Sequence, residues 1–419
     1  MDITISAFGA IAALIIAITL IIKKVHPTYA LILGALIGGL IGGVSLVETV
    51  NFMIDGAKGM ITAILRILTA GVLAGVLIES GAANKIAETI VDKIGESKAL
   101  MALALATMLL TMVGVFIDVA VITVAPIAIA IAQRAGLSKS GILLAMIGGG
   151  KAGNLMSPNP NAIVASENMG VALTDIMMAG IIPAIFGIII TCILAKMVDK
   201  KGSKVEKAKG NKNNKEKLPS FITAISGPLV TIILLALRPI AGIVIDPLIA
   251  LPLGGIVGAI FMGKVKHINS YAIAGLNRMS GVAILLLGTG TIAGIISNSQ
   301  LKNVIINGIT TLGLPSILLA PIAGILMSGA TASTTSGTAV GTSVFGPTIL
   351  ELGVPALSTA AMIHSGATVL DHLPHGSFFH ATGGSVNMEM KERLKLIPYE
   401  TIIGLVMTIV STIVFGLIM

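Results

Sequence analysis

The sequence predicts an all-α polytopic membrane protein, and three observations support this prediction. Hydrophobic residues make up 55% of the chain and charged residues only 11%, whereas soluble domains carry about 25% charged residues. Apolar runs of about 20 residues recur, and an α-helix needs that length to cross a bilayer. Short sequence patterns of the first half also return in the second half in the same order, which indicates an internal repeat.

The apolar runs predict the membrane-crossing helices in chain order. The first run is expected to stay in the protein as a helix, because its lysines, Lys23 and Lys24, follow the run instead of preceding it as in a signal peptide. The plain runs are Ile5–Ile22, Tyr29–Leu46, Met60–Ile78, Ala99–Phe116, Met177–Met197, Phe221–Leu237, Pro247–Met262, Val282–Ile296 and Thr401–Met419.

A lysine-rich segment divides the chain. It runs from Lys196 to Lys217 and is rich in Gly and Asn, so it is too hydrophilic to fold alone. We expect a disordered cytoplasmic linker at residues 199–218, between a first repeat at 1–198 and a second repeat at 219–419. The net charge of +8 is concentrated there, and we expect no nucleic-acid partner.

The repeat is supported by matches that hold a nearly constant offset. "PTYALILGALIG" from Pro27 matches "PLIALPLGGIVG" from Pro247. "AMIGGGKAGNLMSPNP" from Ala145 matches "AMIHSGATVLDHLPHG" from Ala361. Each half therefore predicts the same plan: two plain spans, a third span with an amphipathic charged piece, a re-entrant hairpin, a broken helix and a last span.

This plan gives five crossings per half, so the second half is expected to lie inverted relative to the first. The hairpins pair Ala99–Phe116 with Val119–Gln133, and Pro315–Met327 with Ala339–Leu350; they break at "GVFIDVA" and "SGATASTTSGT". With the linker in the cytoplasm, most Lys and Arg residues fall on the inside, as the positive-inside rule requires. Both termini are then outside.

The breaks predict one binding site near the middle of the membrane. Irregular backbone at that depth is tolerated only where it is buried in protein or lines a cavity, and inverted repeats with interrupted helices are typical of secondary transporters. Two alternatives stay open: Lys151 belongs to a structural ion pair, for instance with Asp118, and the hydroxyl-rich hairpin tip only allows close helix packing. The candidate substrate-binding residues are Lys151, Asn154, Ser157, Asn159, Asn161, Thr331, Ser333, Thr334, Thr335, Ser336 and Thr368.

Histidines gather in "HSGATVLDHLPHGSFFHATGG", which contains four of the six in the chain. Because histidine titrates near physiological pH, this stretch is suited to carry a coupled proton. Hydrogen bonds from these histidines to backbone carbonyls are one alternative. A zinc site at "HLPH" is another, but Pro374 disfavours it, and we expect neither a metal nor a cofactor. The candidate proton-coupling residues are Asp118, His364, Asp371, His372 and His375.

The chain resembles a known family in two motifs, "GGGKAGNLMSPNPN" and "HSGATVLDHLPHGSFFHATGGSVNM". Both are similar to motifs of the gluconate permease (GntP) family, and the order of spans resembles the ion-transporter superfamily of inverted-repeat carboxylate carriers. The resemblance implies a proton-coupled symporter of gluconate or a related small hydroxy-monocarboxylate. It also implies an elevator-like motion, a homodimer, a place in the bacterial cytoplasmic (inner) membrane and no enzymatic activity.

Two rival functions remain at this point. A sodium-coupled carboxylate carrier or a sodium/proton antiporter could use the same fold. A membrane metalloenzyme built on the histidines is the rival from another class of protein.

Overall fold

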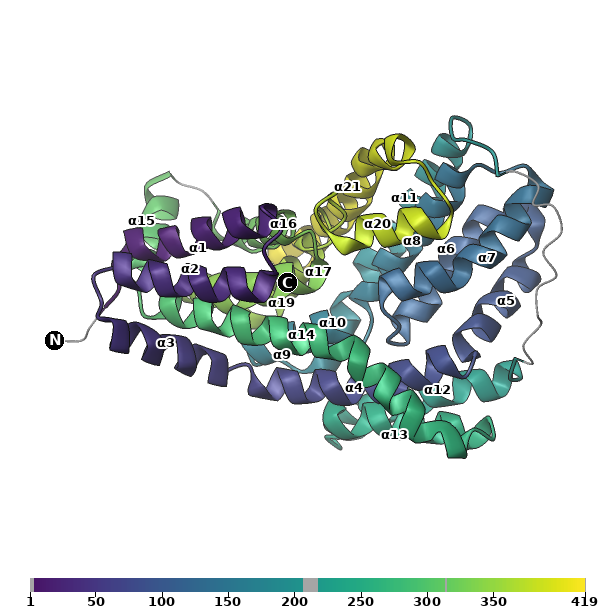
Figure 1. Cartoon of the computed structure of the whole chain (residues 1–419), viewed down its shortest axis with the longest axis horizontal. Helices are drawn as coiled ribbons and strands as arrows, with labels where there is room; N and C mark the ends of the chain where they lie inside the picture. Colours follow the sequence, from purple (N-terminus) through teal and green to yellow (C-terminus); the bar gives the residue numbers. More distant parts are fainter. Residues whose placement is uncertain (1–3, 206–217, 313–314, 419) are drawn as a thin grey trace.

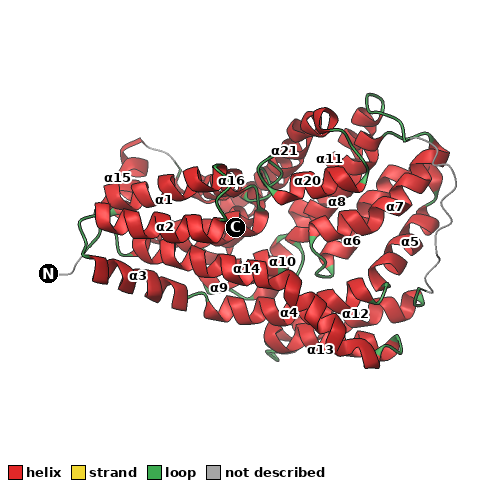
Figure 2. Ribbon diagram, viewed as in Figure 1, coloured by secondary structure: helices red, strands yellow, loops and turns green. Residues whose placement is uncertain are grey.

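The computed structural model describes residues 4–205, 218–312 and 315–418, and its regular elements in those ranges are helices (Figures 1 and 2). Pairing between extended segments is limited there to isolated bridges. The prediction of an all-α protein is therefore confirmed. Most of the predicted linker, residues 206–217, lies outside the described residues.

The helices before the linker begin at local capping signals. Ser6, Ser45, Ser138 and Asn159 each accept a hydrogen bond from a backbone N–H in the first turn of the helix that follows, and such a bond satisfies a donor left unpaired at the helix end. The helices are α1 (Ala7–Ile22), α2 (Pro27–Ile41), α3 (Leu46–Lys58), α4 (Ile61–Glu79), α5 (Ala82–Ile94), α6 (Ala99–Met112), α7 (Ile117–Ala135), α8 (Lys139–Leu155), α9 (Pro160–Met169), α10 (Leu173–Ala179) and α11 (Ile181–Asp199).

The helices after the linker pack in part against the helices before it. A single helix, α14, runs beside both α3 and α4 (Figure 1). The inverted relation of the halves and their five crossings each stay a prediction. The helices are α12 (Phe221–Ala241), α13 (Pro247–Phe261), α14 (Ile268–Ser297), α15 (Leu301–Leu312), α16 (Leu319–Thr331), α17 (Thr334–Val340), α18 (Gly346–Glu351), α19 (Ala356–Gly366), α20 (Ser377–Ser385) and α21 (Met390–Thr412).

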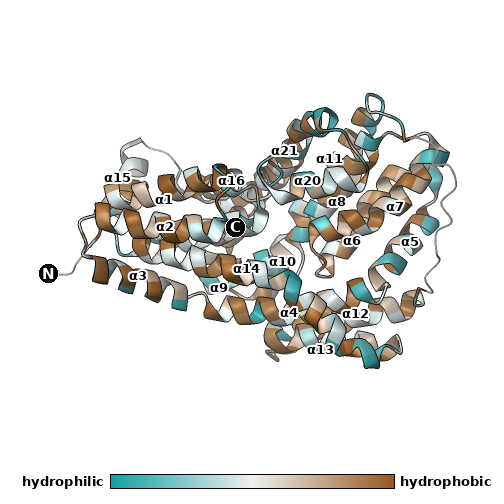
Figure 3. Ribbon diagram, viewed as in Figure 1, coloured by the Kyte–Doolittle hydropathy of each residue, from teal (hydrophilic) through white to brown (hydrophobic). Residues whose placement is uncertain are grey.

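Most helices consist largely of hydrophobic residues, as a bilayer requires (Figure 3). Within the described ranges, six segments are long and apolar enough to cross a membrane. On α11 the large side chains Ile185, Ile189 and Ile193 are about half exposed, while the small residues Ala184 and Ala195 are buried. Large apolar residues therefore face outward and small ones face the protein, as in helices that pack together in lipid.

Glycines allow α4 and α14 to touch backbone to backbone. A Cβ atom on Gly275 of α14 would overlap the carbonyl oxygen of Gly71 on α4, and a Cβ on Gly75 would overlap the carbonyl oxygen of Tyr271. Backbone atoms cannot move aside as a flexible side chain can. This crossing therefore fixes how α14 is rotated against α4.

Replacing Gly275 with leucine is expected to destabilise the fold by about 3 kcal/mol or more, because the new side chain overpacks a backbone contact. The matched control is Gly281→Leu on the same helix, where no atom lies within 4 Å of the added Cβ. Size-exclusion profiles and melting temperatures of the two purified variants in detergent give the comparison. Equal behaviour of the two variants would contradict the proposed role of the crossing.

The structure corrects several predicted boundaries. The helix expected from Val282 begins at Ile268, and the last helix begins at Met390, not Thr401. The hairpin break predicted at residues 328–338 is mostly helical, and only residues 332–333 separate α16 from α17. Polar residues continue these helices because their hydroxyls bond to carbonyls one turn back, as Ser328 does.

Each half also contains the broken helix that the sequence predicts, and the structure gives the ends of each break. Gly148–Asn154 belong to α8, which ends at Leu155, and α9 begins at Pro160. The second break separates Gly366 at the end of α19 from Ser377 at the start of α20. Proline and asparagine mark the first break because proline cannot continue a helix and Asn159 caps the next one.

Candidate functional site

The interrupted helices meet at a central cavity of about 380 Å³. Its wall includes residues from both hairpin tips and both helix breaks, together with one face of α14. Ile117, Pro160, Thr334 and Ser377 all line it, and each is the first residue of its helix. The positive ends of α7, α9, α17 and α20 therefore point towards the cavity and favour an anion there.

The predicted site residues fall into two groups. One group lines the cavity: Asp118, Asn154, Asn159, Asn161, Ser333, Thr334, Thr335 and Asp371. The other group lies outside the cavity wall: Lys151, Ser157, Thr331, Ser336, Thr368, His364, His372 and His375.

Lys151 lies directly behind Asp371 and is fully buried. Its ammonium group donates to Asp371 Oδ1 at 2.5 Å and to the Thr368 carbonyl at 2.6 Å, and it lies 3.0 Å from His372 Nδ1. These partners use all three protons of the ammonium group. Lys151 thus pairs with Asp371, not with Asp118 as the structural alternative proposed, and has no proton left for a ligand in this conformation.

Asp371 connects this buried group to the cavity. Its Oδ2 accepts a hydrogen bond of 2.6 Å from Thr334 at the tip of the second hairpin. Only 4% of the residue is exposed. A carboxylate buried this deeply is stable because a cation and hydrogen-bond donors surround it.

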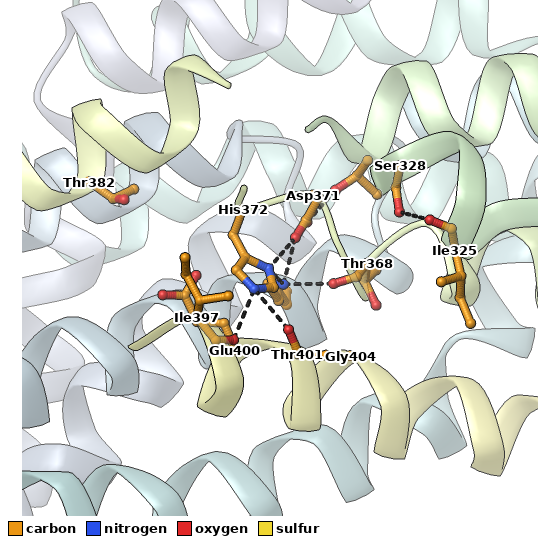
Figure 4. Close-up of polar contacts among 12 residues, drawn as sticks. Ile325, Ser328, Thr368, Asp371, His372, Thr382, Ile397, Glu400, Thr401 and Gly404 are labelled. Carbon is orange, nitrogen blue, oxygen red and sulfur yellow. Dashed lines mark hydrogen bonds and ion pairs between the residues drawn. The ribbon is translucent and has the colours of Figure 1, made fainter. Parts of the chain in front are cut away.

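His372 completes the group (Figure 4). Its Nε2 lies 3.1 Å from the Ile397 carbonyl and 3.2 Å from Thr401 Oγ1 on α21. Because a carbonyl oxygen only accepts, Nε2 carries a proton, and Nδ1 accepts from Lys151 when it holds a lone pair. Nδ1 also lies 3.1 Å from Asp371 Oδ1, so it has a second partner available on protonation.

Amide side chains form the opposite part of the cavity wall. Asn159 caps α9 through its Oδ1 and donates from Nδ2 to Asn154 Oδ1 at 2.5 Å. Asn161 Oδ1 accepts from Thr335 Oγ1, also at 2.5 Å. Both bonds occupy the amide oxygens, so the Nδ2 groups of Asn154 and Asn161 are the parts left to donate to a ligand.

The remaining histidines do not join Asp371. His364 is buried beside a separate space of about 10 Å³ next to Ser411. His375 Nε2 lies 3.2 Å from the Ala330 carbonyl. His372 and His375 thus have different partners, and among the described residues no three His, Cys, Asp or Glu side chains gather as metal ligands.

Two arginines that are not among the candidate residues have notable positions in the structure. Arg278 lines the cavity. Arg393 is 2% exposed, forms a bidentate pair with the fully buried Glu400, and packs over the Phe379 ring. Placing an arginine inside an otherwise apolar segment costs free energy, so both arginines could have been identified from the sequence as residues with a partner or a function.

A second group of charges lies at the far end of α9. Arg66 contacts Glu167 on α9 and donates to both carboxylate oxygens of Asp246, which caps α13. The guanidinium group beside Asp246 holds the pKa of that carboxyl below its usual range. Arg66 of α4 therefore links α9 to the start of α13.

A helical membrane protein whose interrupted helices meet at a polar cavity belongs to the class of membrane transporters. The family model of the GntP family permeases matches residues 1–418. The chain belongs to the GntP permease family, so it is a transporter and not an enzyme. That result excludes the membrane metalloenzyme.

Individual relatives agree with this assignment. An uncharacterized transporter of Haemophilus influenzae is 66% identical over 413 residues, which cover 99% of each chain. A gluconate permease of Pseudomonas aeruginosa is 25% identical and covers 96% of this chain and 94% of its own. The crystal structure of the YdaH transporter of Alcanivorax borkumensis covers 88% of both chains with a TM-score of 0.65 and 17% identity, so the two proteins share a fold.

Proposed function

We propose that this protein takes up gluconate or a related small hydroxy-monocarboxylate by symport with protons. The observation that carries the proposal is the buried contact of Lys151 and His372 with Asp371, beside a cavity where four helix N-termini meet. The P. aeruginosa relative is described as a gluconate permease, which supports the substrate class.

The coupling follows from charge balance. With Lys151 charged, Asp371 ionised and His372 neutral, the group has no net charge. One added proton gives it a charge of +1, and a unit charge near a bound carboxylate contributes on the order of 2 kcal/mol, or about 30-fold in affinity. Because binding linkage is reciprocal, the carboxylate raises the proton affinity by the same factor.

We place the added proton on Nδ1 of His372. This atom then donates to Asp371 Oδ1, which lies 3.1 Å away, and Lys151 loses one acceptor. The other oxygen of Asp371 faces Thr334 and the cavity. A proton bound behind Asp371 therefore changes the electrostatic potential in the cavity. One proton and one monocarboxylate leave the loaded site neutral, which lowers the cost of moving it across a bilayer.

Other parts of the proposal follow the family resemblance. The two halves form inverted repeats of five crossings with both termini outside, and the protein is a homodimer in the bacterial inner membrane. The part that contains the interrupted helices moves as a unit in an elevator-like motion. The bacterial origin of the relatives supports the inner membrane as the location.

Uptake into proteoliposomes tests the coupling ion. With a labelled probe, either gluconate or 3-hydroxybutyrate, we expect an inwardly directed pH gradient to drive accumulation and a sodium gradient alone to drive none. The apparent affinity is expected to rise as external pH falls, because the protonated group favours the anion. Accumulation driven by sodium alone would instead support the sodium-coupled rival, which could use the oxygen atoms of Asp371, Thr334 and Asn161 as ligands.

A further inference from the structure

We propose that Arg278 on α14 recognises the carboxylate of the substrate, and that Gly281 beside it leaves room for that group. The proposal rests on the proposed function, because it requires an anionic substrate in the cavity. It places the binding of the substrate carboxylate on α14, a helix that belongs neither to the hairpins nor to the broken helices.

The charges of the cavity wall indicate that Arg278 is the residue that binds the carboxylate. Among the described residues that line the cavity it is the only positively charged one, while Asp118 and Asp371 are the negative ones. Lys151, the other nearby cation, is fully buried and has three partners for its three protons. A carboxylate in the cavity therefore has Arg278 as its available counter-charge.

The guanidinium group of Arg278 has donors to spare. Its one hydrogen bond within the described chain runs from Nη2 to Glu79 Oε1 at 3.2 Å, and both side chains are more than a third exposed. By contrast, Arg66 contacts two carboxylates and Arg393 holds Glu400 with both terminal nitrogens. Nη2 has a second N–H, and Nε and Nη1 are free on either side of it, so one fork of the guanidinium group remains for the two-bond contact that a carboxylate makes best.

Helix geometry directs Arg278 into the cavity. The backbone contact at Gly275, one turn earlier, fixes the rotation of α14. Arg278, Val282 and Leu285 follow at intervals that place them on one face of the helix, and all of them line the cavity. The guanidinium group is therefore held at the wall by the same crossing that anchors the helix.

Gly281 has no packing role in the described structure. Gly275, Gly290 and Gly294 of the same helix press against neighbouring backbone, but no atom lies within 4 Å of a Cβ placed on Gly281. Glycine costs about 1 kcal/mol relative to alanine inside a helix, so its presence needs another reason. Open space beside Arg278 in the cavity wall supplies that reason.

This placement also defines the substrate class. A carboxylate at Arg278 leaves the rest of the molecule facing the amide and hydroxyl groups of Asn161 and Thr335 and the carboxylate of Asp371. Hydroxyl groups suit those partners, whereas a second carboxylate would meet the negative charge of Asp371. The site thus favours hydroxy-monocarboxylates over dicarboxylates.

Ligand binding to the purified full-length protein tests the role of Arg278. Calorimetry with gluconate and with its neutral amide is expected to show that Arg278→Gln weakens gluconate binding about 10- to 100-fold, the value of a charge-assisted bond, and leaves amide binding nearly unchanged. Arg278→Lys is expected to fall in between. Arg134→Gln is the control, because Arg134 forms a comparable exposed pair with Glu96 away from the cavity.

Three further variants separate a binding role from a structural one. Glu79→Gln removes the present partner of Arg278 and is expected to preserve or tighten gluconate binding. If the only role of Arg278 is its ion pair with Glu79, Glu79→Gln and Arg278→Gln should instead lower the melting temperature equally. Gly281→Leu is expected to abolish gluconate binding at an unchanged melting temperature, whereas Gly281→Ala retains binding.

The outcomes distinguish this inference from the proposed function. Wild-type affinity in a monodisperse Arg278→Gln variant would overturn the role of Arg278 and leave proton symport intact. Sodium-driven uptake, together with the expected loss of gluconate affinity in Arg278→Gln, would overturn proton coupling and support the role of Arg278 in binding the carboxylate. Absence of gluconate and 3-hydroxybutyrate binding to the wild-type protein would overturn both.

Discussion

Replacement of Asp371 with asparagine is expected to abolish proton-driven uptake and to destabilise the protein by about 3–5 kcal/mol. The asparagine keeps the shape but removes the charge that Lys151 faces at 2.5 Å. Breaking a buried ion pair by removing one partner leaves the other charge without compensation, and that is the source of the large cost. Thermal unfolding in detergent and uptake under a pH gradient measure the two effects.

The double variant Lys151→Met with Asp371→Leu separates stability from transport. It removes both charges and keeps similar volume, so we expect its melting temperature to return close to the wild-type value while uptake stays absent. Thr334→Val is a milder control, because it removes only the hydroxyl that donates to Asp371 Oδ2. Uptake by Asp371→Asn with wild-type pH dependence would show that the proton is carried elsewhere.

Removing the guanidinium group of Arg393 is expected to cost a similar 3–5 kcal/mol in stability, with a different effect on transport. Arg393→Met leaves the fully buried Glu400 without its cation and also ends the contact with the Phe379 ring on α20. Neither member of the pair lines the cavity. Protein that does fold should therefore bind substrate with an affinity near that of the wild type.

Glu400→Gln together with Arg393→Met gives the matched test. The double variant removes both charges and should regain most of the lost melting temperature. The exposed pair of Lys58 and Asp55 provides a control, because exposed ion pairs contribute only about 0–1 kcal/mol. If Arg393→Met melted like Lys58→Met, the buried pair would have no measurable role in stability.

The sequence predicted much of the fold because hydropathy is a local property. The span expected at Met60–Ile78 is α4 (Ile61–Glu79) within one residue at each end. Boundaries failed where polar residues interrupted the apolar runs, as at Arg278 and Arg393. Those residues lie within helices and pair with Glu79 and Glu400, and such partners are not visible in a hydropathy pattern.

The candidate site was predicted in part. The sequence indicated which residue types belong in the breaks, and Asn154, Asn161, Thr334 and Asp371 do line one cavity. It did not indicate that His372 alone among the candidate histidines contacts Asp371, or that Lys151 lies behind that carboxylate. The roles of these residues in transport stay predictions until the variants are measured.

The sequence by itself determined the class of protein, the helical content and the regions in which helices break, because chain composition, apolar run length and the backbone limits of proline act over a few neighbouring residues. Only the tertiary structure decided which charges meet. Lys151 and Asp371 are joined across separate helices, and Arg278 reaches the cavity because glycine contacts fix the rotation of α14. The energy of a buried charge depends on the partners around it in space, and helix packing sets those partners.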